Sequence, residues 1–273
     1  MVTEFSFRRW VSRRPFAGAR LPRAGPNAVA VAGLLALVAL APAAEAQGGG
    51  KGFLFKRPVG SFSFYGGYAL ANASSDVFND ATSQLTLDKR DFSNWMLGGD
   101  ISFAATEKMD LVFDGSFTSA SKASEFREFV DNNDQPIAQS TKFKRVPLTA
   151  GLKYYFADRG RSVSQFAYIP KRYAPYIGVG AGAMHYRFAQ TGDFVDFNTP
   201  NLEVFRATIE DGGWAPMAQG TAGLDVSVGP WLAVTAEGRY QWAKARLDPD
   251  QFEGYDKIDL SGFTGTVGFR VRF

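Results

Sequence analysis

The sequence predicts an all-β fold, an eight-stranded antiparallel up-and-down transmembrane β-barrel. Three observations predict it: segments in which apolar and polar residues alternate, connections that alternate between short and long, and an aromatic carboxy-terminus. Alternation indicates strands, because successive side chains of a strand point to opposite faces of the sheet. In the closing segment, 263–273, the apolar face ends on Phe273, and the opposite face carries Arg270 and Arg272.

The first 46 residues have the pattern of a secretory signal peptide. Six arginines precede an apolar run at 28–41, and Ala44 and Ala46 supply the small residues that a signal peptidase reads. The run is shorter than a membrane-spanning helix requires. We therefore predict a signal peptide at 1–46, cleaved near Ala46, a linker at 47–57 and a barrel at 58–273.

Two further properties of the leader affect the interpretation. Arg13 and Arg14 resemble a twin-arginine export signal; an Arg-rich leader is favoured, because a membrane barrel has to cross the inner membrane unfolded. The leader also carries most of the positive charge, so a net charge of +3 for the whole chain becomes about −1 after cleavage. No nucleic-acid partner is predicted. The absence of cysteine means that the fold needs no disulfide.

Eight segments with a period of two follow the linker, separated by stretches rich in Gly, Asn and Asp. The predicted strands span about 58–72, 92–105, 109–119, 143–156, 174–188, 214–228, 231–243 and 263–273. The fifth strand is rich in glycine, with Gly178, Gly180 and Gly182, and its lipid-facing side is left open.

In the other strands, each apolar face is defined by apolar side chains at alternate positions. In the first four strands these are Phe62, Phe64, Tyr68 and Leu70, then Trp95, Leu97, Ile101 and Phe103, then Leu111, Phe113 and Phe117, then Val146, Leu148, Ala150, Leu152, Tyr154 and Phe156. In the sixth and seventh strands they are Ala218, Ala222, Leu224, Val226 and Val228, then Leu232, Val234, Ala236, Tyr240 and Trp242. Aromatic residues make up 15% of the chain and often lie near strand ends, where the girdles of a membrane barrel are expected.

The connections fall into two sets. The first set is mostly tight, with turns at 106–108 and 229–230 and a longer connection at 158–173. The second set is long throughout, at 73–91, 120–142, 189–213 and 244–256. Short turns on one side and long loops on the other are typical of outer-membrane barrels, whose long loops lie outside the cell. An even number of strands leaves both termini on the short-turn side.

The charged residues distinguish a membrane barrel from a soluble one, whose apolar face points inward. Seven charged residues fall on the polar faces at or near the middle of strands, where contact with hydrocarbon would cost about 2–4 kcal/mol for each Arg or Lys. They are therefore predicted to face either water or a closed polar interior. These residues are Asp100, Asp114, Lys153, Asp225, Glu237, Arg239 and Arg270.

Together these features resemble the small eight-stranded outer-membrane proteins of the OmpA/OmpX and OmpW type. The resemblance implies a location in the outer membrane of a Gram-negative bacterium, with outer-membrane lipid and lipopolysaccharide as neighbours. It also implies that Phe273 is part of the signal read by the barrel-assembly machinery. No functional motif of a family is matched, so no functional residue is carried over, and the fold by itself does not fix the function.

Eight strands enclose an interior just wide enough for side chains to fill. Glu237 and Arg239 share the polar face of one strand, and Arg270 belongs to its expected neighbour. These charges could form a gate or an ion path. A structural salt-bridge core is favoured, because removing one partner of a buried pair costs about 3–5 kcal/mol.

His185 is the only histidine and the first candidate for catalysis. Lipid A deacylases resemble this architecture and use a His followed two residues later by a Ser, whereas Arg187 holds that position here. A lone His without a nucleophile or an orienting acid favours an ordinary strand residue. No catalytic residue is predicted.

Oxygen-rich clusters occur in the predicted long loops. They are Asp76, Asn79 and Asp80, then 131–134, then Asp248 and Asp250. Such clusters can bind calcium, but Asp and Asn also dominate ordinary turns, and turns are favoured, with 131–134 at the tip of a hairpin that extends beyond the membrane. No phosphate-binding loop or zinc spacing appears, so neither a cofactor nor a metal site is predicted.

Three functions are open at this point. The leading hypothesis is a non-enzymatic envelope protein with a filled interior and long extracellular loops, which serves envelope stability or surface interaction with an external partner left open. The second is an OmpW-like passage or binding site for small hydrophobic solutes, motivated by Gly178, Gly180 and Gly182, which could thin or bend the wall. A lipid A-modifying enzyme ranks last.

Overall fold

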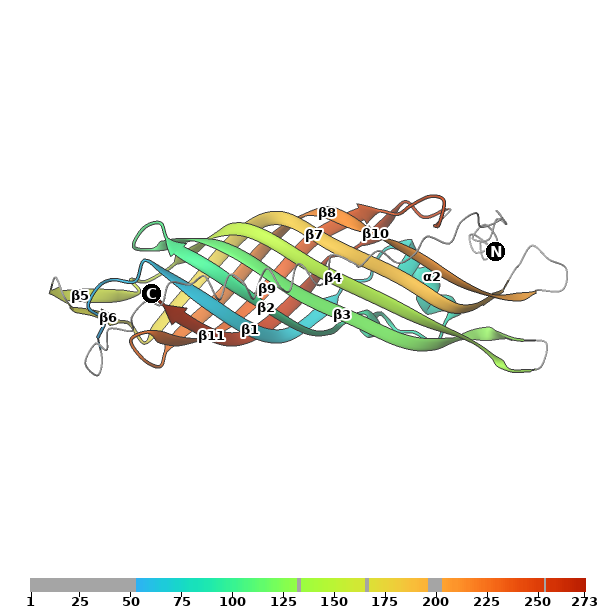
Figure 1. Ribbon diagram of the computed structural model, residues 1–273, viewed down its shortest axis with the longest axis horizontal. Coiled ribbons are helices and arrows are strands. Elements are labelled where there is room, and N and C mark those ends of the chain that lie inside the picture. Colours follow the sequence, from blue (N-terminus) through green and yellow to red (C-terminus); the bar gives the residue numbers. More distant parts are fainter. Residues whose placement is uncertain (1–52, 132–133, 165–166, 196–202, 253) are drawn as a thin grey trace, which may run out of the picture.

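The computed structural model describes residues 53–131, 134–164, 167–195, 203–252 and 254–273; the predicted signal peptide lies outside these residues. Eight strands form a closed antiparallel ring, in which each strand pairs with the next and the last pairs with the first (Figure 1). The ring consists of β1 (Gly60–Ala71), β2 (Asn94–Ala104), β3 (Met109–Val130), β4 (Pro136–Tyr155), β7 (Tyr173–Val195), β8 (Val204–Ser227), β9 (Leu232–Arg246) and β11 (Gly262–Arg272). The predicted fold class is confirmed.

The two faces of the wall follow the predicted alternation. In β1, Phe64 is 55% exposed on the outside, whereas its neighbour Ser63 is fully buried in the lumen. The register carries the alternation around the ring, because Phe64 lies opposite Phe269 of β11 and Ser63 lies opposite Arg270. The same large apolar side chains that defined the strands in the sequence thus form the outer surface.

The structure settles the orientation of β7. Ile177 and Val179 face outward, and the three glycines between and after them, Gly178, Gly180 and Gly182, face the lumen. A Cβ atom at Gly178 would lie 2.6 Å from the hydroxyl oxygen of Thr221. These glycines therefore leave room for side chains of neighbouring strands rather than opening a gap in the wall.

The prediction of long loops at 120–142 and 189–213 is wrong for most of these residues, which belong to strands. Strands β3, β4, β7 and β8 contain 22, 20, 23 and 24 residues, about twice the 9–11 that cross a membrane. They continue as two tall hairpins (Figure 1). The tip predicted near 131–134 is confirmed in place, since Gln135 donates its backbone N–H to the Asp131 carboxylate at 2.8 Å. We call this side of the barrel the hairpin end.

The predicted loop at 73–91 contains a helix, α2 (Asp76–Gln84), and a single turn of 3-10 helix, η2 (Lys89–Phe92). The α2 helix buries Val77, Phe78 and Ala81 along one side, so the first oxygen-rich cluster belongs to a helix rather than to the predicted turn. The loop at 244–256 begins as the end of β9, and β10 (Lys257–Asp259), which follows it, pairs back onto that strand. Asp248 and Asp250 do form a turn, in which the Asp250 backbone N–H donates to the Asp248 carboxylate at 3.0 Å.

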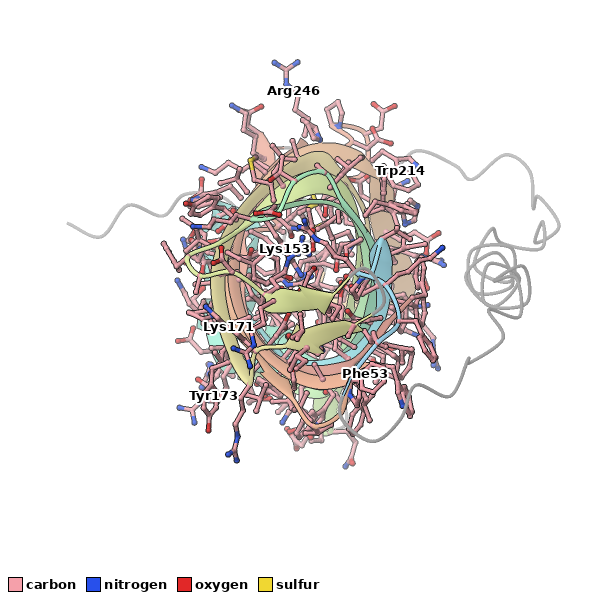
Figure 2. All side chains as sticks on the ribbon, turned by 90° about the vertical axis from the view of Figure 1, so that its left-hand side faces the viewer. Phe53, Lys153, Lys171, Tyr173, Trp214 and Arg246 are labelled. Carbon is pink, nitrogen blue, oxygen red and sulfur yellow. The ribbon has the colours of Figure 1, made fainter. Side chains whose placement is uncertain are left out.

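The opposite side, the short-turn end, carries both the start of β1 and the carboxy-terminus (Figure 1). The connection at 158–173 folds into a small hairpin of β5 (Gly160–Ser164) and β6 (Ala167–Pro170), which lies across the opening in Figure 2. Leu54 of the predicted linker forms a β-bridge with Tyr168 of β6. Among the described residues, no helix is long and apolar enough to cross a membrane.

Candidate functional site

The lumen holds the sequence-predicted charged residues, and the structure brings all seven together. Each is at most 9% exposed, and Figure 2 shows Lys153 inside the ring of strands. They come from β2, β3, β4, β8, β9 and β11, so every one of these strands contributes through its inward-facing positions. We call this group the polar layer. It lies toward the short-turn end, where Asp225 and Arg270 line the same opening as Arg57.

Arg239 forms one centre of the polar layer. Its guanidinium contacts the carboxylate of Glu237 at 2.6 Å and that of Asp114 at 2.8 Å. The ring of Tyr65 lies 4.8 Å from the guanidinium carbon, and the Tyr65 hydroxyl donates a hydrogen bond to Asp114. Arg239 is thus held by two carboxylates and an aromatic face, a geometry that its planar fork of donors suits.

Arg270 forms the second centre. It pairs with Asp225 and, at 3.8 Å, with Asp100. Two neutral groups complete its surroundings, since it donates to the hydroxyls of Ser63 and Tyr155, each at 2.9 Å. Charge-assisted hydrogen bonds of this kind are stronger than hydrogen bonds between neutral groups.

Lys153 connects the two centres. Its ammonium nitrogen lies 3.1 Å from Glu237, which belongs to the Arg239 centre, and 3.8 Å from Asp100, which belongs to the Arg270 centre. The seven residues therefore form one continuous network of four acids and three bases. Hydrogen bonds within such a network polarise and strengthen one another in a low-dielectric interior.

Three tyrosines that were not predicted as site residues complete the polar layer. Tyr65, Tyr155 and Tyr176 are each at most 3% exposed. Tyr176 donates to Glu237 at 2.7 Å and places its ring 4.9 Å from the Lys153 ammonium. Tyr65 and Tyr155 were identifiable from the inward positions of their strands, whereas Tyr176 belongs to β7, whose inward side was unknown.

Little free space remains among these side chains. The cavity beside Asp114, Lys153 and Arg239 measures about 20 Å³, and the one beside Arg270 at the short-turn opening about 30 Å³. A cavity needs about 10–15 Å³ to hold one water molecule. Each of these two cavities therefore has room for one or two water molecules.

A second, apolar layer fills the lumen toward the hairpin end. Phe78 of α2 lies at its centre, with ring centroids 4.6 Å from Phe92, 5.3 Å from Phe143 and 5.6 Å from Phe188. Phe143 and Phe188 are the inward side chains of β4 and β7, so the helix closes the barrel by packing against its inner wall. We call this group, with the remaining buried side chains of the same cluster, the apolar layer.

Hydrogen bonds hold α2 to the segment that leads into β11. Ser74, just before the helix, donates to the carboxylate of Asp259 at 2.5 Å, and the Asp259 backbone N–H donates to Ser75 at 3.1 Å. From the loop that follows β9, Tyr255 donates to Asp80 of the helix at 2.5 Å. Burial alone would raise the pKa of Asp259, but its hydrogen bonds, from Ser74 and Ser261, outweigh burial and lower it.

Arg145 lies at the junction of the two layers. It is 3% exposed, its guanidinium carbon lies 5.2 Å from the centre of the Phe143 ring, and it donates to the backbone carbonyl of Leu260 at 3.3 Å. None of the described carboxylates pairs with it within 4.0 Å. Its neighbours thus combine the aromatic wall of one layer with a backbone acceptor.

The outer surface between the two ends is an apolar belt. Its exposed side chains include Phe64, Leu70, Trp95, Leu97, Phe113, Phe117, Leu148, Leu152, Ile177, Val179, Trp214, Trp242, Phe263, Val267 and Phe269. Apolar groups facing outward and ionised groups facing inward are the reverse of a water-soluble barrel. The belt and the buried charges together make this a membrane-spanning barrel.

His185 lies on the outer wall, away from the polar layer. Its ring packs edge-on against Trp214 of the neighbouring strand, with centroids 5.1 Å apart. Trp214 is 60% exposed as part of the belt. The surroundings of His185 are those of an aromatic pair on the outer face, near the middle of β7 and β8. Among the described residues, no three His, Asp or Glu side chains are arranged to hold a metal ion.

Comparison with known proteins finds similarity in solved structures alone. No family model matches the chain, and no curated protein matches it. The attachment invasion locus protein Ail of Yersinia pestis is 18% identical with a TM-score of 0.39, over 78% of this chain and 99% of that one. Outer membrane protein W of E. coli is 15% identical with a TM-score of 0.38, over 80% and 99%. The N-terminal barrel of Pseudomonas aeruginosa OprF is 12% identical with a TM-score of 0.36, over 79% and 98%.

Proposed function

We propose that the protein is a non-enzymatic outer-membrane barrel with a closed lumen, which stabilises the cell envelope or presents its hairpins to a partner. One observation carries the proposal: the lumen is filled at two levels, by the polar layer and by the apolar layer. A transport route would have to open both. A barrel filled in this way acts through its outer surface and its ends rather than through its interior.

The orientation follows from the unequal ends. In outer-membrane barrels the short turns lie in the periplasm and the long connections outside the cell. The hairpins of β3–β4 and β7–β8 would therefore stand outside the cell, and the start of β1 and Phe273 would lie on the periplasmic side. Removal of 1–46 during export and recognition of Phe273 by the barrel-assembly machinery belong to the same proposal.

The hairpins suit surface interaction because they are ladders rather than loose loops. The β7–β8 pairing continues without interruption from Tyr173 opposite Val226 to Val195 opposite Val204. Backbone hydrogen bonds on this scale hold exposed side chains in fixed positions, which reduces the entropy lost when a partner binds.

The alternative, a passage for small hydrophobic solutes, was motivated by three glycines that could thin or bend the wall, and their positions do not support it. Gly178, Gly180 and Gly182 face the lumen, and a Cβ atom at Gly182 would lie 2.0 Å from the carbonyl oxygen of Leu148. The glycines accommodate close-lying atoms and do not open the wall. For the lipid A-modifying enzyme, His185 has Trp214 as its aromatic neighbour on the outer belt, which suits packing rather than catalysis.

Single-channel recording of the refolded protein in planar bilayers tests the proposal, with a general porin as the positive control. We expect no defined conductance for the wild type. A variant that loosens the apolar layer, Val77→Ala with Phe78→Ala, should also be closed, because the polar layer remains. Steady openings of the wild type would refute the closed lumen; openings of the variant alone would show that the apolar layer is the sole barrier.

A further inference from the structure

Three basic side chains gather on the outer wall just beyond the apolar belt, on adjacent strands. They are Lys142 and Lys144 of β4 and Arg187 of β7, and we call them the basic patch. All three occupy outward positions of their strands, at which Lys142 and Arg187 are exposed and Lys144 is partly exposed. None belongs to the polar layer or the apolar layer.

The strand register places like charges face to face. Lys144 lies directly opposite Arg187, and Lys142 lies opposite Ala189 at the next outward position. Like charges at directly opposed positions destabilise a sheet. Arg187 has a partner in Glu210. The two lysines form no ion pair with any described carboxylate, so the patch keeps an excess of positive charge.

The same register fixes the level of the basic patch. One outward step toward the short-turn end, Val146 lies opposite His185, and His185 lies opposite Trp214. Trp214 is part of the apolar belt, and tryptophan side chains prefer the headgroup level of a membrane. The basic patch therefore lies where the hydrocarbon of the outer leaflet ends and its charged headgroups begin.

Hydroxyl groups border the basic patch on the β3 side. Ser119 lies opposite Lys144, and Ser121 lies opposite Lys142. Hydroxyl groups can donate hydrogen bonds to phosphate oxygens. An arginine offers two parallel donors to a phosphate, and lysines add point charges. The combination of these donors with unpaired positive charge is suited to an anion that carries several oxygens.

We propose that the basic patch binds the phosphate groups of a phosphorylated glycolipid in the outer leaflet. The proposal rests on the proposed placement in the outer membrane and deepens it by naming the lipid group that the wall recognises. The bound phosphate would relieve the repulsion between Lys144 and Arg187. The apolar belt directly beneath would contact the acyl chains of the same lipid.

The test uses the mature protein refolded into phosphatidylcholine vesicles. The relative affinity for diphosphorylated lipid A is measured through its displacement of a brominated phosphatidylcholine that quenches tryptophan fluorescence. We expect the variant Lys142→Gln with Lys144→Gln to bind about thirtyfold more weakly, since each of the two lysines contributes about 1 kcal/mol toward anionic lipid near a membrane surface. The matched control, Lys56→Gln with Lys257→Gln, removes the same charge elsewhere and should bind as the wild type does.

Two further arms identify the group that is recognised. Lipid A without phosphates should bind the wild type and the patch variant equally weakly, and millimolar inorganic phosphate should not displace the phosphorylated lipid. Equal binding of lipid A with and without phosphates, an unaffected patch variant, or displacement by inorganic phosphate would each overturn the proposal. The conductance of the barrel is independent of this result, so a conducting protein that still selects phosphorylated lipid would refute the closed lumen and leave the patch standing.

Discussion

The two layers of the lumen block the same barrel with opposite chemistry. In the polar layer, Glu237 serves Arg239, Lys153 and Tyr176 at once, so its stability depends on complete pairing. In the apolar layer, Phe78 packs against three other rings without any specific bond, so its stability depends on filled volume. A polar network that loses one member leaves a buried charge, whereas an apolar cluster that loses one member leaves a cavity.

This difference matches the origin of each layer. The polar layer is built by side chains of the barrel wall alone, and it forms when the ring closes. The apolar layer requires a separate element, α2, which enters the opening and is fastened by Ser74 and Tyr255. We therefore expect changes in the polar layer to alter the stability of the whole barrel, and changes in the apolar layer to cause only local opening around α2.

The largest effect should come from Arg239→Met. The substitution leaves Asp114 and Glu237 in the lumen with one basic partner fewer, and we expect the free energy of unfolding to fall by about 3–5 kcal/mol. Urea unfolding of the protein in lipid vesicles measures it. Arg161→Met, an exposed arginine of β5, is the control and should change little. A loss below about 1 kcal/mol would show that the polar layer tolerates an unpaired charge.

Phe78→Ala should cost about 3 kcal/mol, the lower part of the range for a buried phenylalanine, and the loss should be local. Amide hydrogen exchange should accelerate in 76–84 while β9 keeps its protection. Ser83→Ala, on the exposed side of the same helix, should leave both unchanged. Equal acceleration in β9 would contradict the independence of the two layers.

Gly178→Val should cost about 1–3 kcal/mol, as overpacking of a filled interior does. A Cβ atom there meets Thr221 at 2.6 Å and the carbonyl oxygen of Leu152 at 3.0 Å. Gly265→Val on β11 is the matched control, because no atom lies within 4 Å of its added Cβ. The same urea titration measures both. A neutral result for Gly178→Val would mean that the lumen beside β7 has free volume.

The smallest effect should come from acidification, which should loosen α2. We expect its local stability to fall by about 1 kcal/mol, because the hydrogen bonds to the Asp259 carboxylate are lost. The pKa of Asp259 is lower in the folded protein than in the unfolded chain. Its contribution is therefore complete above the ordinary aspartate pKa of about 3.9 and disappears as the pH falls through the lowered value. Hydrogen exchange of 76–84, compared with Asp259→Asn at each pH, measures the effect. A constant difference between the two proteins down to pH 2 would contradict it.

The wall was predictable from the sequence because lipid enforces alternation. Large side chains such as Phe64 and Trp95 had to face outward, and their neighbours inward. The hairpin extensions were missed for the same reason: beyond the membrane both faces of a strand meet water, so 120–130 lacks an apolar outer face and reads as a loop. In β7, glycines have no side chain that would show which face is apolar. The inward position of Tyr176 could therefore not be predicted.

The charged members of the candidate site were predictable individually, but their partners were not. Period two places Asp100 and Arg270 inside, while their meeting depends on how the strands shift around the ring. Arg145 lies on the same inward face of β4 as Lys153, whereas its acceptor, the backbone carbonyl of Leu260, is 115 residues away and could not be predicted. The α2 helix was missed because nine residues with three buried positions give too short a pattern to separate from a polar loop.

The hairpins of unequal reach give the molecule a front and a back. Four adjacent strands, β3, β4, β7 and β8, have 20 to 24 residues, while the other four have 11 to 15 (Figure 1). At the hairpin end, one half of the barrel therefore extends farther from the membrane than the other half. A neighbouring molecule in the membrane contacts long strands on one side of the barrel and short strands on the other, so the contacts of this barrel with its surroundings are directional.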